Sequence, residues 1–206
     1  MLIVFAGLPG SGKSTIARAL GRHSPAPVLS VDPVEAALLR SGIEREQPTG
    51  LAAYVVVEAM AADLLSLGQA VIVDAVNDAE EAREQWRNLA ERQRAPLVWI
   101  EVVCSDPDLH RRRLAGRERD LPGFPEPAWA SLETRRPGLA AWMDERLILD
   151  SVREPQTNVE TALDHLRTAR VRGITCGIAE EDVDSLRRSG NPTRRGRLPE
   201  GDGPDS

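Results

Sequence analysis

The chain of 206 residues has few cysteines, few aromatic residues and no long uninterrupted apolar run. Its two cysteines, Cys104 and Cys176, are too few for a disulfide framework and suit a reducing compartment, so we expect both to be unpaired. The most apolar stretch, residues 51–65, is interrupted by Glu58 and Asp63 and therefore predicts no membrane-spanning helix. The apolar N-terminal residues lack the charged segment of a signal peptide. We therefore expect a cytoplasmic protein.

The chain also lacks an excess of positive charge. Its 26 basic residues stand against 32 acidic ones, which gives a formal net charge of −6. This balance argues against a long nucleic-acid track or an anionic membrane surface as the main partner, although it leaves room for a small basic patch. Of the 26 basic residues, 25 are arginine and one is lysine, Lys13. The lone lysine is therefore the first place to look for chemistry.

Short β-branched runs alternate with helical patterns along most of the chain. The expected strands are residues 2–6, 27–31, 70–73, 97–104 and 146–149. The expected helices are residues 13–22, 34–40, 51–67, 79–93, 109–117 and 159–170. Four of the strand candidates are nearly continuous apolar runs, as is typical of strands that are buried on both faces of a parallel sheet. The sequence thus predicts an α/β fold: a five-stranded, mainly parallel sheet with helices on both faces.

Residue types at the helix ends support these boundaries. Ser105 or Asp106 is expected to cap the fifth helix, and Asn158 is expected to cap the last one. Gly42 and Gly68 stand where a helix should end.

Two regions depart from the strand and helix alternation. Residues 122–138 contain four prolines and no strand pattern, so we expect a loop with one short helix, part of a small lid at about residues 111–138. The tail, residues 171–206, is rich in glycine and proline. It predicts one short helix at residues 179–188 and disorder from residue 189 onward. One domain is therefore expected over residues 1–170.

The first strand runs directly into a glycine-rich loop that ends in the lone lysine. Residues 7–14 match G-x-x-x-x-G-K-[ST] in the strand, loop and helix context that a chance match lacks. Such a loop binds a triphosphate mainly through backbone N–H groups and the helix N-terminus. The expected nucleotide-binding residues are Gly7, Leu8, Pro9, Gly10, Ser11, Gly12, Lys13, Ser14 and Thr15. The alternative is a glycine-rich turn with a surface lysine.

Two residues of this loop have predicted roles beyond binding the nucleotide. Lys13 is expected to reach the β and γ phosphates of ATP, and the Ser14 hydroxyl to ligate Mg²⁺. A second ligand is expected at the end of the third strand, where Asp74 follows a buried apolar run at the edge of the sheet that binds ligands. The alternative for Asp74 is a helix cap, and Asn77 is a candidate for either task.

Asp32 follows the second strand and precedes Pro33. At this edge of the sheet its carboxylate is placed to take the proton of an acceptor hydroxyl as a phosphoryl group is transferred. The alternative is a helix cap, because proline is favoured at the first position of a helix.

An arginine cluster precedes the proline-rich insertion. Arg113 and Arg117 are four residues apart and are expected to share a helix face that points at the phosphates, where guanidinium groups neutralise the transferring phosphoryl group. A solvated helix face is the rival interpretation. Arg135 and Arg136, on the other side of the insertion, are weaker candidates, and the three histidines receive no role.

With these residues placed, the chain resembles the P-loop NTPase group of zeta-toxin, polynucleotide-kinase and gluconate-kinase type proteins, in particular the short bacterial ATP-binding proteins of the AAA family 33 type. The resemblance covers residues 1–170. The matching segments are FAGLPGSGKSTIARAL, LSVDP, GQAVIVDAVND with Arg83 nine residues past Asp74, VCSDPDLHRRRLAGR and RLILDS. It implies an ATP-dependent phosphotransferase with Asp32 as the acceptor-side base, Asp74 at Mg²⁺ and Arg113 or Arg117 in the lid. Residues 43–51 and the insertion carry no acceptor motif.

Three functions are compatible with the sequence. The first is a kinase that moves the γ-phosphoryl group of Mg-ATP to a hydroxyl of a small molecule. The second is a polynucleotide 5′-hydroxyl kinase, against which the acidic charge and the absence of a basic stripe with stacking aromatics both count. The third is an ATP-binding regulatory switch with weak ATPase activity. The sequence does not indicate the acceptor or the oligomeric state.

Overall fold

The sheet has five strands and is parallel throughout. The computed structural model describes residues 1–44, 46–117 and 127–171. Its strands are β1 (Leu2–Ala6), β2 (Val28–Ser30), β3 (Val71–Asp74), β4 (Leu97–Val103) and β5 (Leu147–Asp150). They lie in the order β2-β3-β1-β4-β5, and all four neighbouring pairs are parallel. The predicted fold class is therefore confirmed, and the carboxyl ends of all five strands meet at one edge.

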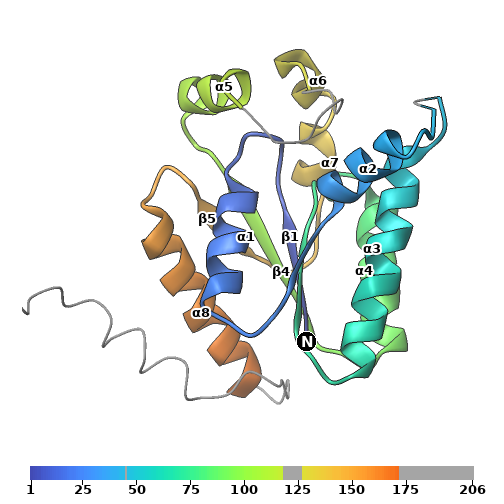
Figure 1. Cartoon of the computed structure of the whole chain (residues 1–206). Helices are drawn as coiled ribbons and strands as arrows, with labels where there is room; N and C mark the ends of the chain where they lie inside the picture. Colours follow the sequence, from blue (N-terminus) through green and yellow to red (C-terminus); the bar gives the residue numbers. More distant parts are fainter. Residues whose placement is uncertain (45, 118–126, 172–206) are drawn as a thin grey trace, which may run out of the picture.

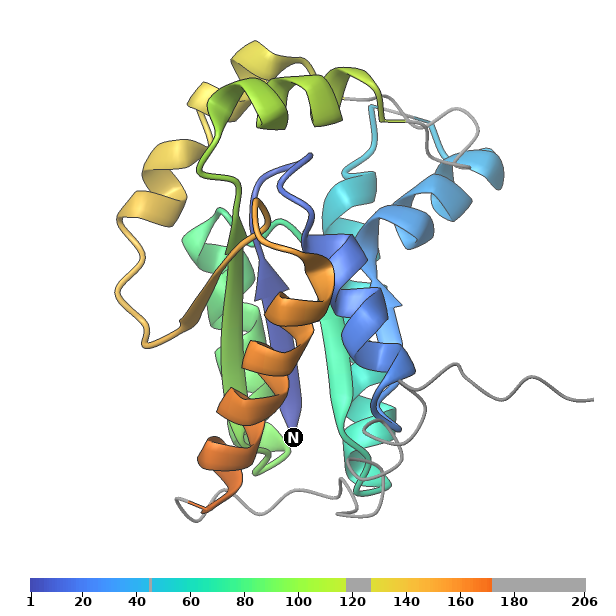
Figure 2. The same ribbon diagram turned by 90° about the vertical axis from the view of Figure 1, so that its left-hand side faces the viewer.

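Helices cover both faces of the sheet and its carboxyl edge. They are α1 (Lys13–Arg22), α2 (Val31–Arg40), α3 (Thr49–Ser66), α4 (Glu80–Arg92), α5 (Pro107–Ala115), α6 (Trp129–Glu133), α7 (Arg136–Ala140) and α8 (Pro155–Val171). Helices α1 and α8 pack on one face, and α3 and α4 on the other (Figure 1). Helices α5, α6 and α7 lie above the ends of the strands, as the turned view also shows (Figure 2).

The alternation of side chains along β1 divides the core between the two faces. Ile3 and Phe5 point into the cluster beneath α1 and α8, whereas Leu2, Val4 and Ala6 point into the cluster beneath α3 and α4. All five are fully buried, as expected for the central strand of a sheet that is covered on both faces.

Several predicted helix ends are confirmed. The side chain of Asp106 caps α5 by accepting hydrogen bonds from the backbone N–H groups of Asp108 and Leu109, both at 2.9 Å. Gly42 and Gly68 follow α2 and α3 with φ of +93° and +78°, which are left-handed conformations that glycine adopts most readily.

The predicted cap of the last helix is wrong. Helix α8 begins at Pro155, three residues before Asn158, so Asn158 lies inside its first turn. The Asn158 side-chain amide instead donates to the backbone oxygen of Asp150 at 3.0 Å, and thereby fastens the start of α8 to the end of β5.

The insertion also differs from the prediction of one short helix, because the structure has two, α6 and α7. Part of the predicted lid, residues 118–126, and the tail beyond residue 171 lie outside the described residues. The short helix and the disorder predicted for the tail are therefore not addressed by the structure.

Candidate active site

The glycine-rich loop joins β1 to α1 at the carboxyl edge of the sheet. Gly7 has a φ of +142°, and a Cβ atom there would lie 2.4 Å from the backbone oxygen of Val102 in β4. Gly12 has a φ of +92° and precedes α1, whose N-terminus has no side-chain cap. The first N–H groups of α1 are thus left without a capping side chain, and they form a ready site for an anion such as phosphate.

Lys13 and Asp74 form a buried ion pair beside this loop. Lys13 Nζ lies 3.7 Å from Asp74 Oδ1, and both side chains are only 4% exposed. Ser30 donates its hydroxyl to the other oxygen, Asp74 Oδ2, at 3.1 Å. Asp74 Oδ1 has no hydrogen-bond partner among the residues that the structure describes. An unbonded buried carboxylate oxygen fits a cation ligand, because buried polar atoms otherwise find partners.

The helix-cap interpretation of Asp74 is wrong, because α4 begins at Glu80, six residues after it, and its N-cap position is Ala79. Within the described part of the chain, no group of three or more His, Cys, Asp or Glu side chains converges on a possible metal position. Ser14 and Asp74 are the candidate residues for holding Mg²⁺ together with the phosphates of a nucleotide, which is how this ion is usually bound.

A cavity of about 310 Å³ opens in front of the loop and α1. It is lined by Gly10, Gly12, Lys13, Ser14, Thr15, Ile16, Arg113, Arg117, Ser151, Arg153, Pro155 and Asn158. The structure thus brings five of the predicted nucleotide residues together with both predicted arginines. Gly7, Leu8, Pro9 and Ser11 do not line this cavity; Leu8, for example, packs into the core.

The two arginines reach the cavity in different ways. Arg113, in the last turn of α5, donates to the hydroxyl and the backbone oxygen of Ser151 at 2.7 and 3.1 Å. Arg117 lies beyond the end of α5 at Ala115, so the prediction that the two share a helix face is wrong. Its Nη2 atom lies 3.6 Å from Asp32 Oδ2. Arg113 is thus fixed to the turn after β5, whereas Arg117 reaches toward α2.

Asp32 lies in the first turn of α2 instead of at the end of a strand. Strand β2 ends at Ser30, and Ser30 is also the N-cap position of α2. Asp32 therefore does not cap the helix. Its carboxylate is paired with Arg117, which brings the predicted base and a predicted phosphate ligand into one contact.

A second acid–arginine pair and the partly buried Tyr54 lie near Asp32. Arg135 Nε lies 3.9 Å from Asp78 Oδ2, and the hydroxyl of Tyr54 accepts a hydrogen bond from the backbone N–H of Asn77 at 3.2 Å. Burial raises the pKa of Tyr54, and the nearby carboxylates of Asp78 and Asp32 raise it further. Tyr54 therefore stays protonated. The sequence offered no signal for Tyr54 or Asp78, because α3, α7 and the loop after β3 meet only in the fold.

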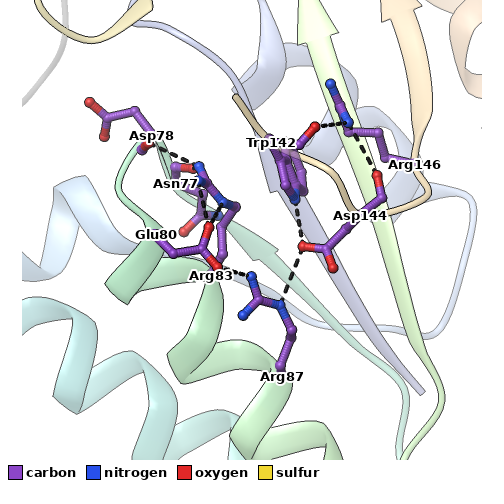
Figure 3. Close-up of polar contacts among 8 residues, drawn as sticks. All are labelled: Asn77, Asp78, Glu80, Arg83, Arg87, Trp142, Asp144 and Arg146. Atoms are coloured by element: carbon purple, nitrogen blue, oxygen red, sulfur yellow. Dashed lines mark hydrogen bonds and ion pairs between the residues drawn. The ribbon is translucent and has the colours of Figure 1, made fainter. Parts of the chain in front are cut away.

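The loop after β3 is fixed by Asn77. This residue is fully buried with a φ of +52°. Its side chain donates to the backbone oxygen of Phe5 at 2.8 Å and accepts from Trp86 Nε1 at 2.9 Å. Arg83 donates to the backbone oxygens of Asn77 and Asp78 at 3.0 and 2.9 Å (Figure 3). The side-chain amide of Asn77 thus fastens this loop to β1 and α4.

Trp142 holds the segment after α7 against this loop. Its ring lies between the guanidinium groups of Arg83 and Arg146, at 5.3 and 4.5 Å, and meets Trp99 edge to face at 5.0 Å. Its indole N–H donates to Asp144 at 2.6 Å (Figure 3). Trp142 is 3% exposed, so it is part of the core.

His110 is a residue that the sequence interpretation missed. It lies on α5, is 2% exposed, and its Nε2 atom lies 2.8 Å from the backbone oxygen of Pro9 in the glycine-rich loop. Because a carbonyl oxygen only accepts, Nε2 carries the proton. Burial lowers the pKa of His110, so the neutral form is favoured. The sequence indicates the burial of His110 only through its position, because a residue four places after the cap Asp106 faces inward on α5.

Comparisons with known proteins identify the family and the fold of the chain. A family model, AAA_33, described as an AAA domain, matches residues 2–137. A search of curated proteins finds no match to the chain.

Three solved structures illustrate the shared fold. Kti12 of Chaetomium thermophilum, in complex with ADP-AlF3, is 19% identical with a TM-score of 0.63, over 82% of this chain and 98% of its own. A sugar kinase of Janibacter sp. HTCC2649, unliganded, is 19% identical with a TM-score of 0.60, over 81% and 94%. The APS kinase CysC of Mycobacterium tuberculosis, in complex with AMPPNP and APS, is 20% identical with a TM-score of 0.58, over 81% and 96%.

The fold is thus that of the P-loop kinases. Because the family model spans more than half of its residues, the chain belongs to the AAA domain family AAA_33.

Proposed function

We propose that the protein is an ATP-dependent phosphotransferase that moves the γ-phosphoryl group of Mg-ATP to a hydroxyl of a small-molecule acceptor. One observation carries the proposal: a single cavity joins the N-terminus of α1, the buried Lys13 and two arginines, one of which is paired with the carboxylate of Asp32. Arg117 therefore joins the residues proposed to bind phosphate to the candidate base, Asp32. We assign the reaction to residues 1–170, with residues 111–138 as the lid.

Residues 7–15 hold the phosphates in this proposal, mostly through backbone N–H groups. Lys13 binds the β and γ phosphates, and Arg113, held by Ser151, supplies a fixed positive charge. Ser14 and Asp74 hold Mg²⁺, which neutralises charge on the phosphate oxygens when bound. When the nucleotide binds, Lys13 therefore replaces part of its contact with Asp74 by contacts with the phosphates.

The acceptor is placed by Asp32, Asp78, Arg117 and Arg135. Asp32 takes the proton from the acceptor hydroxyl as the phosphoryl group leaves ATP, while Arg117 lies beside its carboxylate. Two carboxylates and two guanidinium groups suit a small polar acceptor. The net charge of −6 gives little support to a polynucleotide acceptor. We place the reaction in the cytoplasm, since two cysteines suit a reducing compartment.

The Asp32–Arg117 contact also favours a second candidate, an ATP-binding switch. Asp32 is paired with Arg117, which lines the nucleotide cavity. Whether Asp32 is available as a base therefore depends on whether a nucleotide occupies that cavity. A switch of this kind hydrolyses ATP slowly and needs no acceptor.

An acceptor screen distinguishes the two. Sugars, nucleosides, aminoglycosides and short oligonucleotides are tested by thermal shift with a nonhydrolysable ATP analogue, and the hits are tested for ADP release from ATP. A kinase releases ADP far faster with its acceptor than with water. Slow ADP release that no acceptor accelerates would contradict the kinase and favour the switch.

The metal assignment is tested by binding instead of turnover. We expect Asp74→Asn to weaken the Mg²⁺ dependence with which a nonhydrolysable ATP analogue binds, measured by calorimetry over a magnesium titration. Asp78→Asn is the matched control, because it lies on the acceptor side and should leave that dependence unchanged. An Asp74→Asn variant with the wild-type magnesium titration would remove Asp74 from the site.

A further inference from the structure

Helix α5 lies across the carboxyl edge of the sheet, above the glycine-rich loop (Figure 2). In the middle of α5, His110 brings its Nε2 atom to 2.8 Å from the backbone oxygen of Pro9 in this loop. A Cβ atom on Gly10 would lie 3.2 Å from Cδ2 of His110 and 3.2 Å from Cβ of Leu114. The helix therefore contacts the loop at two successive residues, Pro9 and Gly10.

The hydrogen bond to Pro9 also determines the direction of the next N–H group. The oxygen of Pro9 and the N–H of Gly10 belong to one peptide unit, which is planar and trans. In such a unit the C=O and N–H bonds point in opposite directions. Because His110 holds the Pro9 oxygen toward α5, the N–H of Gly10 points away from α5.

The N–H of Gly10 is available to a ligand. Gly10 lines the nucleotide cavity, and its left-handed φ of +82° is typical of loops whose successive N–H groups surround an anion. The N–H of Ser11 is bonded to the backbone oxygen of Leu8 at 3.0 Å. The N–H of Gly10, by contrast, has no hydrogen-bond partner among the described residues. It is therefore free to donate to a phosphate oxygen.

Glycine alone does not hold this peptide unit in place. A glycine accepts positive and negative φ about equally, so the unit between Pro9 and Gly10 could rotate. Rotation would turn the Pro9 oxygen, which carries partial negative charge, toward the phosphates and would take the N–H away from them. The unit therefore needs a partner outside the loop, and His110 is that partner.

Packing fixes the ring of His110. The residue is 2% exposed, and the ring of Trp129, on α6, meets it edge to face at 5.2 Å. Helix α5 is also bonded near its end, through Arg113, to Ser151. Because the contact with Pro9 is buried, water does not compete for it, and its direction is set by α5 and α6 together.

We propose that His110 is a positioning residue of the nucleotide site: it holds the Pro9 carbonyl against α5 and thereby presents the N–H of Gly10 to the phosphates. The inference rests on the proposed function, because it requires a nucleotide in the cavity. His110 is not among the described residues that line this cavity, so it acts through the loop. Helix α5 then serves the nucleotide twice, with Arg113 as a charge and with His110 as a support for the loop.

Two substitutions of similar length separate the hydrogen bond from the packing. His110→Gln keeps an N–H donor near the position of Nε2, whereas His110→Met fills the same space without one. Calorimetry should show that His110→Met weakens the binding of AMPPNP and of inorganic tripolyphosphate by about tenfold, the contribution of a typical hydrogen bond. His110→Gln should stay within about threefold of the wild type. His165→Met, on α8, is the control and should bind as the wild type does.

The possible outcomes separate this inference from the proposed function. Wild-type affinity in His110→Met, or equal losses in His110→Gln and His110→Met, would contradict the positioning role, because the donor would then make no difference. If the wild type bound neither AMPPNP nor tripolyphosphate, the proposed nucleotide site would be wrong, and the role of His110 with it.

Nuclear magnetic resonance of the isotope-labelled wild type tests the same contact without a substitution. The amide proton of Gly10 should move downfield when tripolyphosphate is added, because it becomes hydrogen-bonded to a phosphate oxygen. The Nε2 proton of His110 should remain protected from exchange with water in both states. A Gly10 amide that does not shift in a protein that binds tripolyphosphate would overturn the proposal.

Discussion

The proposed nucleotide side and the proposed acceptor side of the site differ in the chemical groups that form them. The nucleotide side consists of backbone N–H groups and buried side chains on adjacent segments, with Lys13 and Asp74 both 4% exposed. The acceptor side consists of partly exposed charged side chains, among them Asp32 at 26% and Arg117 at 18%, from elements far apart in the sequence.

This difference separates what a family shares from what distinguishes its members. The phosphate chain of ATP does not change from one reaction to the next, so one fixed backbone loop can serve a whole family. An acceptor differs from one enzyme to the next and is bound by side chains, which change without altering the fold. Substitutions on the two sides should therefore have separable effects.

The largest effect is expected on the acceptor side. Asp32→Asn should lower phosphoryl transfer by about 10² to 10⁴-fold, the usual contribution of a positioned base, with little change in ATP affinity. Single-turnover transfer and analogue binding measure the two separately. Glu35→Gln, one turn further along α2, is the matched control and should keep its turnover. Wild-type transfer by Asp32→Asn would remove Asp32 from the mechanism.

On the nucleotide side, Lys13→Arg should lower turnover by roughly 10²-fold or more. The charge is kept, but a planar guanidinium is too wide for the place that a compact ammonium occupies beside Asp74. Unlike Asp32→Asn, this change should also weaken ATP binding, which calorimetry detects. Arg18→Lys, on the exposed side of α1, is the control. Full affinity and turnover in Lys13→Arg would overturn the assigned role of the loop.

Arg117 and Arg113 sharpen the comparison, because one arginine is paired with Asp32 and the other with Ser151. Arg117→Ala should lower turnover by roughly 10²-fold with little effect on nucleotide affinity, whereas Arg113→Ala should mainly reduce that affinity. Kinetics at saturating ATP separate the two effects, with Arg112→Ala as an exposed control. Identical profiles for the two variants would contradict this division.

The smallest effect concerns stability and pH. Burial lowers the pKa of His110, so the unfolded chain binds a proton more readily than the folded one. Stability is therefore complete above the ordinary histidine value of about 6.5 and is lost as the pH falls below it. His110→Gln, which can still donate to Pro9, should show a smaller fall in Tm on acidification, measured by calorimetry. His165→Gln is the control and should show the same dependence of Tm on pH as the wild type. If His110→Gln also showed the wild-type dependence, His110 would not be the group responsible.

The sequence predicts local features better than contacts between distant segments. All five strands were predictable from short β-branched runs, four of them nearly continuously apolar, and the cap Asp106 because its residue type and position agree. Asn158 was misassigned because α8 begins earlier, at Pro155, and the amide bonds a strand end instead. In the site, the loop and Asp74 follow from motif and strand order.

The pairing of Asp32 with Arg117 did not follow from the sequence, because it depends on where α5 ends and on how α2 approaches it. The same is true of Tyr54, which reaches Asn77 through the packing of α3 against the loop after β3. Apolar patterning predicts which residues are buried, whereas it contains no information about which exposed charges meet.

The edge-to-face contact between Trp99 and Trp142 gives the molecule an optical signal of its own. Their rings are 5.0 Å apart at an angle of 86°, close enough for the two indole transitions to couple and produce a paired circular dichroism band. Trp99 belongs to β4, whereas Trp142 follows α7. The intensity of that band therefore reports, without any label, whether the segment after α7 is docked on the sheet.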